Sequence, residues 1–292
     1  ARLQCVANAA LHSAIAVLLF VFARAGLPRV THGPAFLLIA LLFAVPLAWE
    51  NPIAGFHSQQ YFLVGFSVAA IWLLPLARPG GIRWWTGVGC MVAALGTMGS
   101  GLLAGATVIA ILAVRAGIRR DLQGTLTGHW PTILAAGLVV ALGAASRVTV
   151  SYHDELMAGS VADFVRFTVH CLQWPARSWS WLAIIIWMPT ALLAWQLARR
   201  KEPEPGEFPL VLLGLAGWVL LQVLATAYTR GADGGMPASR YADTLAFGLL
   251  VNGLILFWLG PQVRPGLLRW GFGAAWTLAV LLPGASLAAT IY

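Results

Sequence analysis

Ten apolar segments, each close to the length of a membrane-spanning helix, dominate this sequence. They cover residues 7–24, 33–49, 61–77, 84–99, 101–116, 131–149, 180–198, 209–228, 243–260 and 271–290. A helix needs roughly 20 apolar residues to cross a bilayer. Only 10% of the residues are charged and 60% are hydrophobic, which excludes a soluble enzyme, a disordered chain and a disulfide scaffold. We therefore predict an all-α integral membrane protein, a bundle of about ten transmembrane helices.

The stretch 84–116 is too short for two full spans and long for one. Gly99-Ser100-Gly101 marks a break in its middle. If the stretch is a short or re-entrant hairpin, 12 of the 18 basic residues fall on one side of the membrane. A single span would instead move the cluster Arg199-Arg200-Lys201 to the outer side, against the positive-inside rule. The charge pattern therefore favours the hairpin.

The same pattern predicts the orientation and the organisation of the chain. The basic loops, which we predict to be cytoplasmic, are 25–32, 78–83, 115–130, 199–208 and 261–270. The outer face then receives 50–60, the 99–101 tip, 150–179 and 229–242. These loops account for the net charge of +8, so we predict no nucleic-acid partner. Residues 1–292 form one transmembrane domain, and because Ala1 is not a Met we expect it to be incomplete at the N-terminus, with the C-terminus open to extension.

The first polar group on the predicted outer face joins the second and third apolar segments. Glu50 directly follows one segment, and His57, Gln59 and Gln60 precede the next. A carboxylate near a low-dielectric region has a raised proton affinity and can act as an acid or a base. The amides and the imidazole can bind sugar hydroxyls or a lipid headgroup. The alternative is an interfacial loop whose polar groups only cap the helices.

The second group covers residues 228–243 and contains Arg230, Arg240, Tyr241 and Asp243. The guanidinium of Arg240 offers five donors in a fork that matches phosphate oxygens. The alternative is an ion pair between Arg240 and Asp243, three residues apart at a helix start, beside a membrane-interface tyrosine. Both interpretations place this segment at the headgroup level.

The third group covers residues 150–179 and predicts an interfacial helix near 161–172. Val161, Phe164, Val165, Thr168 and Leu172 follow a helical period, whereas Asp163, Arg166 and His170 lie opposite. We interpret this helix mainly as a membrane anchor. His153, Asp154 and Glu155 are adjacent and do not converge on one ion in a helix or a strand. We predict no metal site and no cofactor, since the sequence gives no support for a divalent cation.

Three of these motifs together resemble a known group of proteins. They are Trp49-Glu50-Asn51 with Gly55 to Phe62, the turn Gly99 to Leu103, and Ser239 to Asp243. They look like a group of bacterial polytopic proteins that is similar to the GT-C class of membrane glycosyltransferases. The resemblance covers most of the chain. It implies transfer of a sugar from a polyprenyl-phosphate donor to a glycan or lipid-linked acceptor, at the outer face of the bacterial inner membrane.

The resemblance also implies a catalytic carboxylate in the first outer loop, after the first transmembrane helix. No Asp or Glu precedes Glu50 here. Either an N-terminal helix and its loop lie outside this sequence, which the absence of an initial Met favours, or Glu50 takes the role. The sequence departs from the class pattern at this point.

A physical account fits such a transfer. A base must deprotonate the acceptor hydroxyl, and positive charge must stabilise the departing lipid phosphate. Arg240, with Arg230 or Arg147, would supply that charge, and Glu50, His57, Gln59 and Gln60 would hold the sugar or the acceptor.

Two other functions remain open from the sequence. A transporter or lipid flippase would use the same outer residues for recognition, although the segment midplanes are poor in charge and no repeat is visible. A structural membrane subunit predicts that the three outer groups do not converge.

Overall fold

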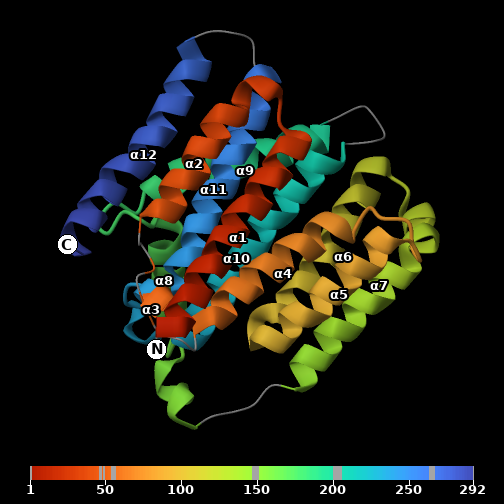
Figure 1. Cartoon of the computed structure of the whole chain (residues 1–292), viewed down its shortest axis with the longest axis horizontal. Coiled ribbons are helices and arrows are strands. Elements are labelled where there is room, and N and C mark those ends of the chain that lie inside the picture. Colours follow the sequence, from red (N-terminus) through yellow and green to blue (C-terminus); the bar gives the residue numbers. More distant parts are fainter. Residues whose placement is uncertain are drawn as a thin grey trace.

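A computed structural model describes residues 2–45, 48, 50–53, 57–146, 151–199, 206–262 and 267–291, which form an all-α bundle (Figure 1). The α-helices are α1 (Arg2–Gly26), α2 (His32–Ala44), α3 (Glu50–Ile53), α4 (Ser58–Leu73), α5 (Ile82–Thr97), α6 (Leu102–Arg119), α7 (Leu122–Ala145), α8 (Val161–Gln173), α9 (Leu182–Arg199), α10 (Glu207–Arg230), α11 (Ala242–Leu259) and α12 (Leu267–Ile291). The short 3-10 helices are η1 (Arg29–Thr31), η3 (Gly99–Gly101), η4 (Ser151–Leu156), η5 (Ala232–Gly234), η6 (Ser239–Tyr241) and η7 (Gly260–Gln262). The predicted all-α class is confirmed.

Six helical stretches within the described residues are long and apolar enough to cross a membrane. They are Leu3–Gly26, Gly99–Arg119, Leu122–Ala145, Leu182–Arg199, Glu207–Arg230 and Ser239–Gln262. These stretches indicate a membrane protein. Each of the ten predicted apolar segments overlaps a helix, but α4 and α5 have only 16 residues, a length of about 24 Å. Within the described residues, length and composition thus identify six candidate spans, and the predicted count of ten is not confirmed.

Helices α10 and α11 form the centre of the bundle. Leu249 to Ile255 are all buried, a run of two helical turns that leaves no exposed face on this part of α11. Trp218 of α10 is fully buried and meets the ring of Phe247 edge-on, with centroids 5.8 Å apart. Helices α2 and α9 pack against α11, and helices α4, α6, α8 and α9 pack against α10, so the pair contacts several elements at once.

Helices α4 to α7 form a second packing unit on one side of the bundle (Figure 1). Glycines let these helices approach closely, as is common between membrane helices. A Cβ atom added at Gly87 would lie 2.8 Å from the Cβ of Leu74, and one added at Gly143 would lie 2.6 Å from the Cβ of Leu102. The helices of this unit therefore pack through close backbone contacts at the glycines as well as through apolar side chains.

The stretch 84–116 contains two helices, α5 and α6, separated at Met98 and η3. The carbonyl of Ser100 in this turn accepts a 3.3 Å hydrogen bond from Nε2 of Gln222. Gln222 lies eight residues before the end of α10, about 12 Å along the helix. The predicted break is present, but the 99–101 tip lies beside the body of α10 rather than level with its end.

Contacts between loops define one end of the bundle, here called the basic end. Arg83 in the first turn of α5 forms an ion pair with Glu207, the first residue of α10. The rings of Phe22 and Phe208 pack with centroids 4.9 Å apart, which brings the end of α1 to the same place. These contacts join loops that the charge pattern assigns to one side.

Helix α8 packs against α9 and α10 at the opposite end. Its buried residues include Phe167 and Cys171, which lie between the apolar and polar faces that the sequence pattern suggested. Burial raises the pKa of the Cys171 thiol to about 12, so it stays protonated. Val161 and Val165 remain exposed, at 81% and 51%. The apolar arc of α8 is thus wider than the predicted face, and only part of it is covered by the bundle.

Candidate functional site

Five polar side chains from four helices meet at the end of the bundle opposite the basic end, and we call them the Asn51 cluster. They are Asn8 and His12 of α1, Asn51 of α3, Tyr61 of α4 and Asp243 of α11. Figure 1 shows α3 and the start of α1 side by side at this end. Buried polar groups are expensive inside a membrane bundle, which makes such a cluster a candidate functional site.

Asn51 is the hub of the cluster and has no exposed surface. Its Nδ2 donates to Oδ2 of Asp243 at 2.8 Å and to the carbonyl of Arg240 at 3.0 Å. The backbone carbonyl of Asn51 accepts a hydrogen bond from Nδ2 of Asn8 at 3.0 Å. One side chain therefore ties the predicted first outer segment to the second, which lies about 190 residues further along the chain.

His12 and Tyr61 line the same cluster from the side of α1 and α4. Nε2 of His12 lies 2.9 Å from the carbonyl of Phe43, near the end of α2. The imidazole meets the Tyr61 ring edge-on, with centroids 5.3 Å apart. Asp243 is within electrostatic reach of both His12 and Tyr61. A carboxylate, an imidazole and a phenol thus share one small region.

Four buried atoms of the cluster have no hydrogen-bond partner among the described residues. They are Oδ1 of Asn8, Nδ1 of His12, Oδ1 of Asn51 and the hydroxyl of Tyr61. Most buried polar atoms in proteins are paired with protein or ordered water, and an unpaired one costs about 1–3 kcal/mol. Four such atoms in one place point to a site that binds water or a polar ligand.

The predicted residues of the first outer segment lie around this cluster. Glu50, the first residue of α3, is half-buried. His57 and Gln60 are each 6% exposed at the start of α4, and Gln59 is half-buried between them in sequence. Helices α3 and α4 contact each other, and Gln60 directly precedes Tyr61 of the cluster.

The predicted residues of the second segment are brought to the same place by η6 and α11. The guanidinium of Arg240 lies over the ring of Tyr241, 5.3 Å from its centroid. Asp243 accepts from Nδ2 of Asn51, and the alternative interpretation, an ion pair between Arg240 and Asp243, is not found between these two described residues. Arg230 ends α10, and its Nη1 lies 3.4 Å from the carbonyl of Thr229. Arg147 lies outside the described residues.

The third predicted group contacts the second one. Nδ1 of His170 in α8 lies 3.2 Å from the carbonyl of Gly235. Gly234 has a φ of +59°, and a Cβ atom there would lie 2.8 Å from Cδ of Arg166, so this turn against α8 requires a glycine. Of the three predicted groups, the first two converge on Asn51 and the third supports the loop of the second.

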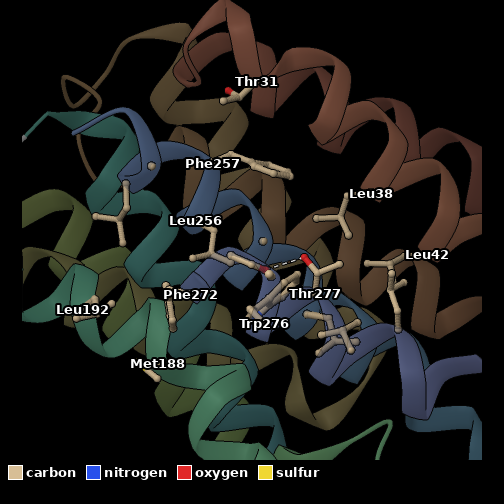
Figure 2. A pocket seen from close by; sticks show the side chains of 18 of the residues that line it. Thr31, Leu38, Leu42, Met188, Leu192, Leu256, Phe257, Phe272, Trp276 and Thr277 are labelled. Carbon is tan, nitrogen blue, oxygen red and sulfur yellow. Dashed lines mark hydrogen bonds between the residues drawn. The ribbon is translucent and has the colours of Figure 1, made fainter. Parts of the chain in front are cut away.

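A large groove lies elsewhere, between α2, α9, α11 and α12, and we call it the α2–α12 groove. Its volume is about 1320 Å³, and its walls are almost entirely apolar (Figure 2). None of the predicted site residues lines it. The residues described in the structure contain no group of three or more His, Cys, Asp or Glu side chains that could hold a metal ion.

Comparison of this chain with protein-family models, with curated proteins and with solved structures finds no match. Sequence reasoning named Asn51 only within a motif and did not single out Asn8 or Tyr61. The signal that could have found them is a polar residue inside an apolar segment, which Asn8, His12 and Tyr61 share.

Proposed function

We propose that this chain is a membrane glycosyltransferase-like protein that transfers a sugar from a polyprenyl-phosphate donor at the Asn51 cluster. In this proposal the cluster faces the exterior of a bacterial inner membrane, and all ten apolar helices lie in the membrane, with α5 and α6 as a short hairpin. The acceptor is a glycan or a second lipid-linked molecule. The proposal extends the resemblance of the sequence motifs to the GT-C class.

The observation that carries the proposal is the bond from Asn51 to Asp243. It joins the two outer segments that contain the matching motifs. Around it lie buried atoms of Asn8, His12, Asn51 and Tyr61 that lack partners among the described residues, so a polar ligand would complete their hydrogen bonding. A purely structural network would be expected to satisfy its own members.

The chemistry requires one base and one positive charge. In an inverting transfer, the acceptor oxygen attacks the anomeric carbon and its proton passes to a carboxylate. The bond from that carbon to the lipid phosphate breaks, and the electron pair leaves on the phosphate oxygen. We assign the base to Asp243, which Asn51 orients, and keep Glu50 as the second carboxylate to be tested.

Arg240 is placed to receive the phosphate. Its side chain is half-buried and stacks on Tyr241, which leaves the edge of the guanidinium for a phosphate oxygen. No ion pair of Arg240 is found among the described residues. His57, Gln59 and Gln60 would then bind sugar hydroxyls.

The test is turnover of polyprenyl-phosphate sugars by the protein in nanodiscs, followed by mass spectrometry of the lipid. Asp243→Asn should lower turnover about 10²–10⁴-fold, the range for loss of a general base, while its amide oxygen can still accept from Asn51. Arg240→Ala should lower turnover by a similar factor. Asp121→Asn is the matched control, because Asp121 caps α7 through the Gly124 amide and Asn caps equally well.

The results of these assays distinguish Asp243 from Glu50 as the base, and the glycosyltransferase from the flippase. If Glu50→Gln abolishes turnover and Asp243→Asn does not, the base is Glu50. Absence of turnover and of binding across a broad donor panel would overturn the proposal. Movement of donor lipid between leaflets without sugar loss would favour the flippase.

A further inference from the structure

The α2–α12 groove is apolar along its length but polar at one end. Leu38 and Leu42 of α2 face Leu256 of α11 and Trp276 of α12 across it (Figure 2). Thr277 also lines the groove, but its hydroxyl donates to the carbonyl of Gly273 at 2.8 Å. The lining runs along α2 from Thr31 to Val45, a rise of about 21 Å. The groove therefore suits a long hydrocarbon rather than a compact polar molecule.

The polar lining lies at the basic end. Nε2 of Gln196 donates to Oε1 of Gln262 at 3.0 Å, and Thr31 comes directly before α2. The other end is bounded by Trp174, Pro175 and Gly284. A ligand with one polar head and an apolar body would thus place its head between Gln196, Gln262 and Thr31.

Positive charge stands at this same end. The guanidinium of Arg199 lies over the ring of Trp195, 4.3 Å from its centroid, and Trp195 lines the groove with 55% of its surface exposed. Arg29, two residues before Thr31, is also exposed. Neither arginine has an ion-pair partner in the part of the chain that the structure describes. The polar head that fits here is anionic.

We propose that the α2–α12 groove binds one anionic phospholipid from the leaflet that the basic loops face. Its acyl chains lie along Leu38, Leu42 and Trp276, and its phosphate lies at Arg199 beside the two glutamines. This site does not rest on the proposed function, because the lipid head is at the end opposite the Asn51 cluster.

The charge at one end of the groove favours a lipid over a transmembrane helix as the occupant. An anionic headgroup would pair with the exposed guanidinium groups of Arg199 and Arg29, whereas the apolar side chains of a transmembrane helix offer them no partner. Hydrocarbon chains can enter the groove from the membrane beside α12, which Figure 1 shows at one edge of the bundle.

Native mass spectrometry of delipidated protein, with phosphatidylglycerol or phosphatidylcholine added back, tests this site. Gly273→Leu should fill the groove, because Gly273 lines it and a Cβ atom there meets nothing within 4 Å. Gly271→Leu is the matched control, on the same helix and with equal free space, but outside the lining. We expect one tightly retained phosphatidylglycerol in the control and at least tenfold weaker binding in Gly273→Leu.

A second pair of variants tests the head. Arg199→Gln should lower the preference for phosphatidylglycerol over phosphatidylcholine about fivefold, the effect of one basic residue near a membrane surface. Arg24→Gln is its control, since Arg24 also lies near an aromatic ring, Phe20, but outside the groove lining. This pair remains decisive if Gly273→Leu does not fold.

Three results would overturn the proposal. One is equal phosphatidylglycerol binding by Gly273→Leu and Gly271→Leu. Another is a lipid preference that survives Arg199→Gln or is lost equally in Arg24→Gln. The third is displacement of phosphatidylglycerol by a polyprenyl phosphate whose binding is independent of Arg199, which would assign the groove to the chain of a donor with its head at the Asn51 cluster.

Discussion

Two buried asparagines form hydrogen bonds at α11, one from within the helix and one from outside it, and their surroundings differ. Asn252 lies in the middle of α11, and Asn51 reaches its first turn from α3; neither has exposed surface. Oδ1 of Asn252 accepts from the amide and the hydroxyl of Thr190, at 3.2 and 2.8 Å, and its Nδ2 donates to the carbonyl of Gly248 at 2.9 Å. Asn51 uses only its donor side, and its Oδ1 has no partner among the described residues.

The difference separates a structural polar contact from a candidate site. Thr190 follows Pro189 inside α9, and its amide turns to Asn252, while the carbonyl of Ile186 accepts from Nε1 of Trp276. Asn252 therefore accepts a backbone hydrogen bond next to the proline that interrupts α9, a compensation that is common in membrane helices. In the Asn51 cluster, by contrast, four polar atoms have no partner within the described part of the chain. A fully bonded network fixes a fold, whereas an open one is ready for a ligand.

The largest effect on stability should follow from Asn252→Ala. It leaves the Thr190 amide and hydroxyl without their acceptor, so we expect the free energy of unfolding to fall by about 2 kcal/mol. Thermal unfolding in one detergent measures this. Thr226→Ala is the control, because its hydroxyl bonds only within α10, and should change stability by less than about 0.5 kcal/mol. If the two variants behave alike, Asn252 is not a structural tie.

Asn51→Ala should have a smaller effect on stability and a larger one on activity. The donors lost serve Asp243 and the Arg240 carbonyl, both in a half-buried segment that water can reach, so the expected cost is about 1 kcal/mol. Turnover of the lipid-linked sugar should fall up to about 100-fold, because Asp243 loses its orientation. A stability loss equal to that of Asn252→Ala, with turnover unchanged, would make both asparagines structural.

The helices could be predicted from the sequence because apolar composition and length are local properties. The break at Gly99-Ser100-Gly101 was also local, and the structure places two helices there. The depth of that turn was not predictable, because it depends on where Gln222 of α10 lies. The same limit applies to α8, whose buried side is decided by the helices that approach Phe167 and Cys171.

The candidate site was predictable in part. Glu50, His57 and Arg240 stand out as polar residues at the ends of apolar segments, and the structure places their segments together through Asn51. Asn8 and Tyr61 lie inside apolar helices, where a single polar residue usually bonds a neighbouring helix. Only the pairing of α1, α3, α4 and α11 shows that these residues share one cluster. The partners are too far apart in the chain for any sequence period to connect them.

The smallest expected effects come from removing one hydroxyl beside Asn252 and one in the Asn51 cluster, and this pair of variants is the sharpest test of the difference between the two asparagines. Thr190→Val deletes a hydroxyl bonded to Asn252 and should lower the free energy of unfolding by about 1 kcal/mol. Tyr61→Phe deletes a buried hydroxyl that has no partner among the described residues, so it should leave stability unchanged or raise it by up to about 1 kcal/mol. Thermal unfolding of both variants, without added donor lipid, measures the difference. Equal losses would mean that the Tyr61 hydroxyl is bonded in the ligand-free protein, and the Asn51 cluster would then be a structural network like that of Asn252.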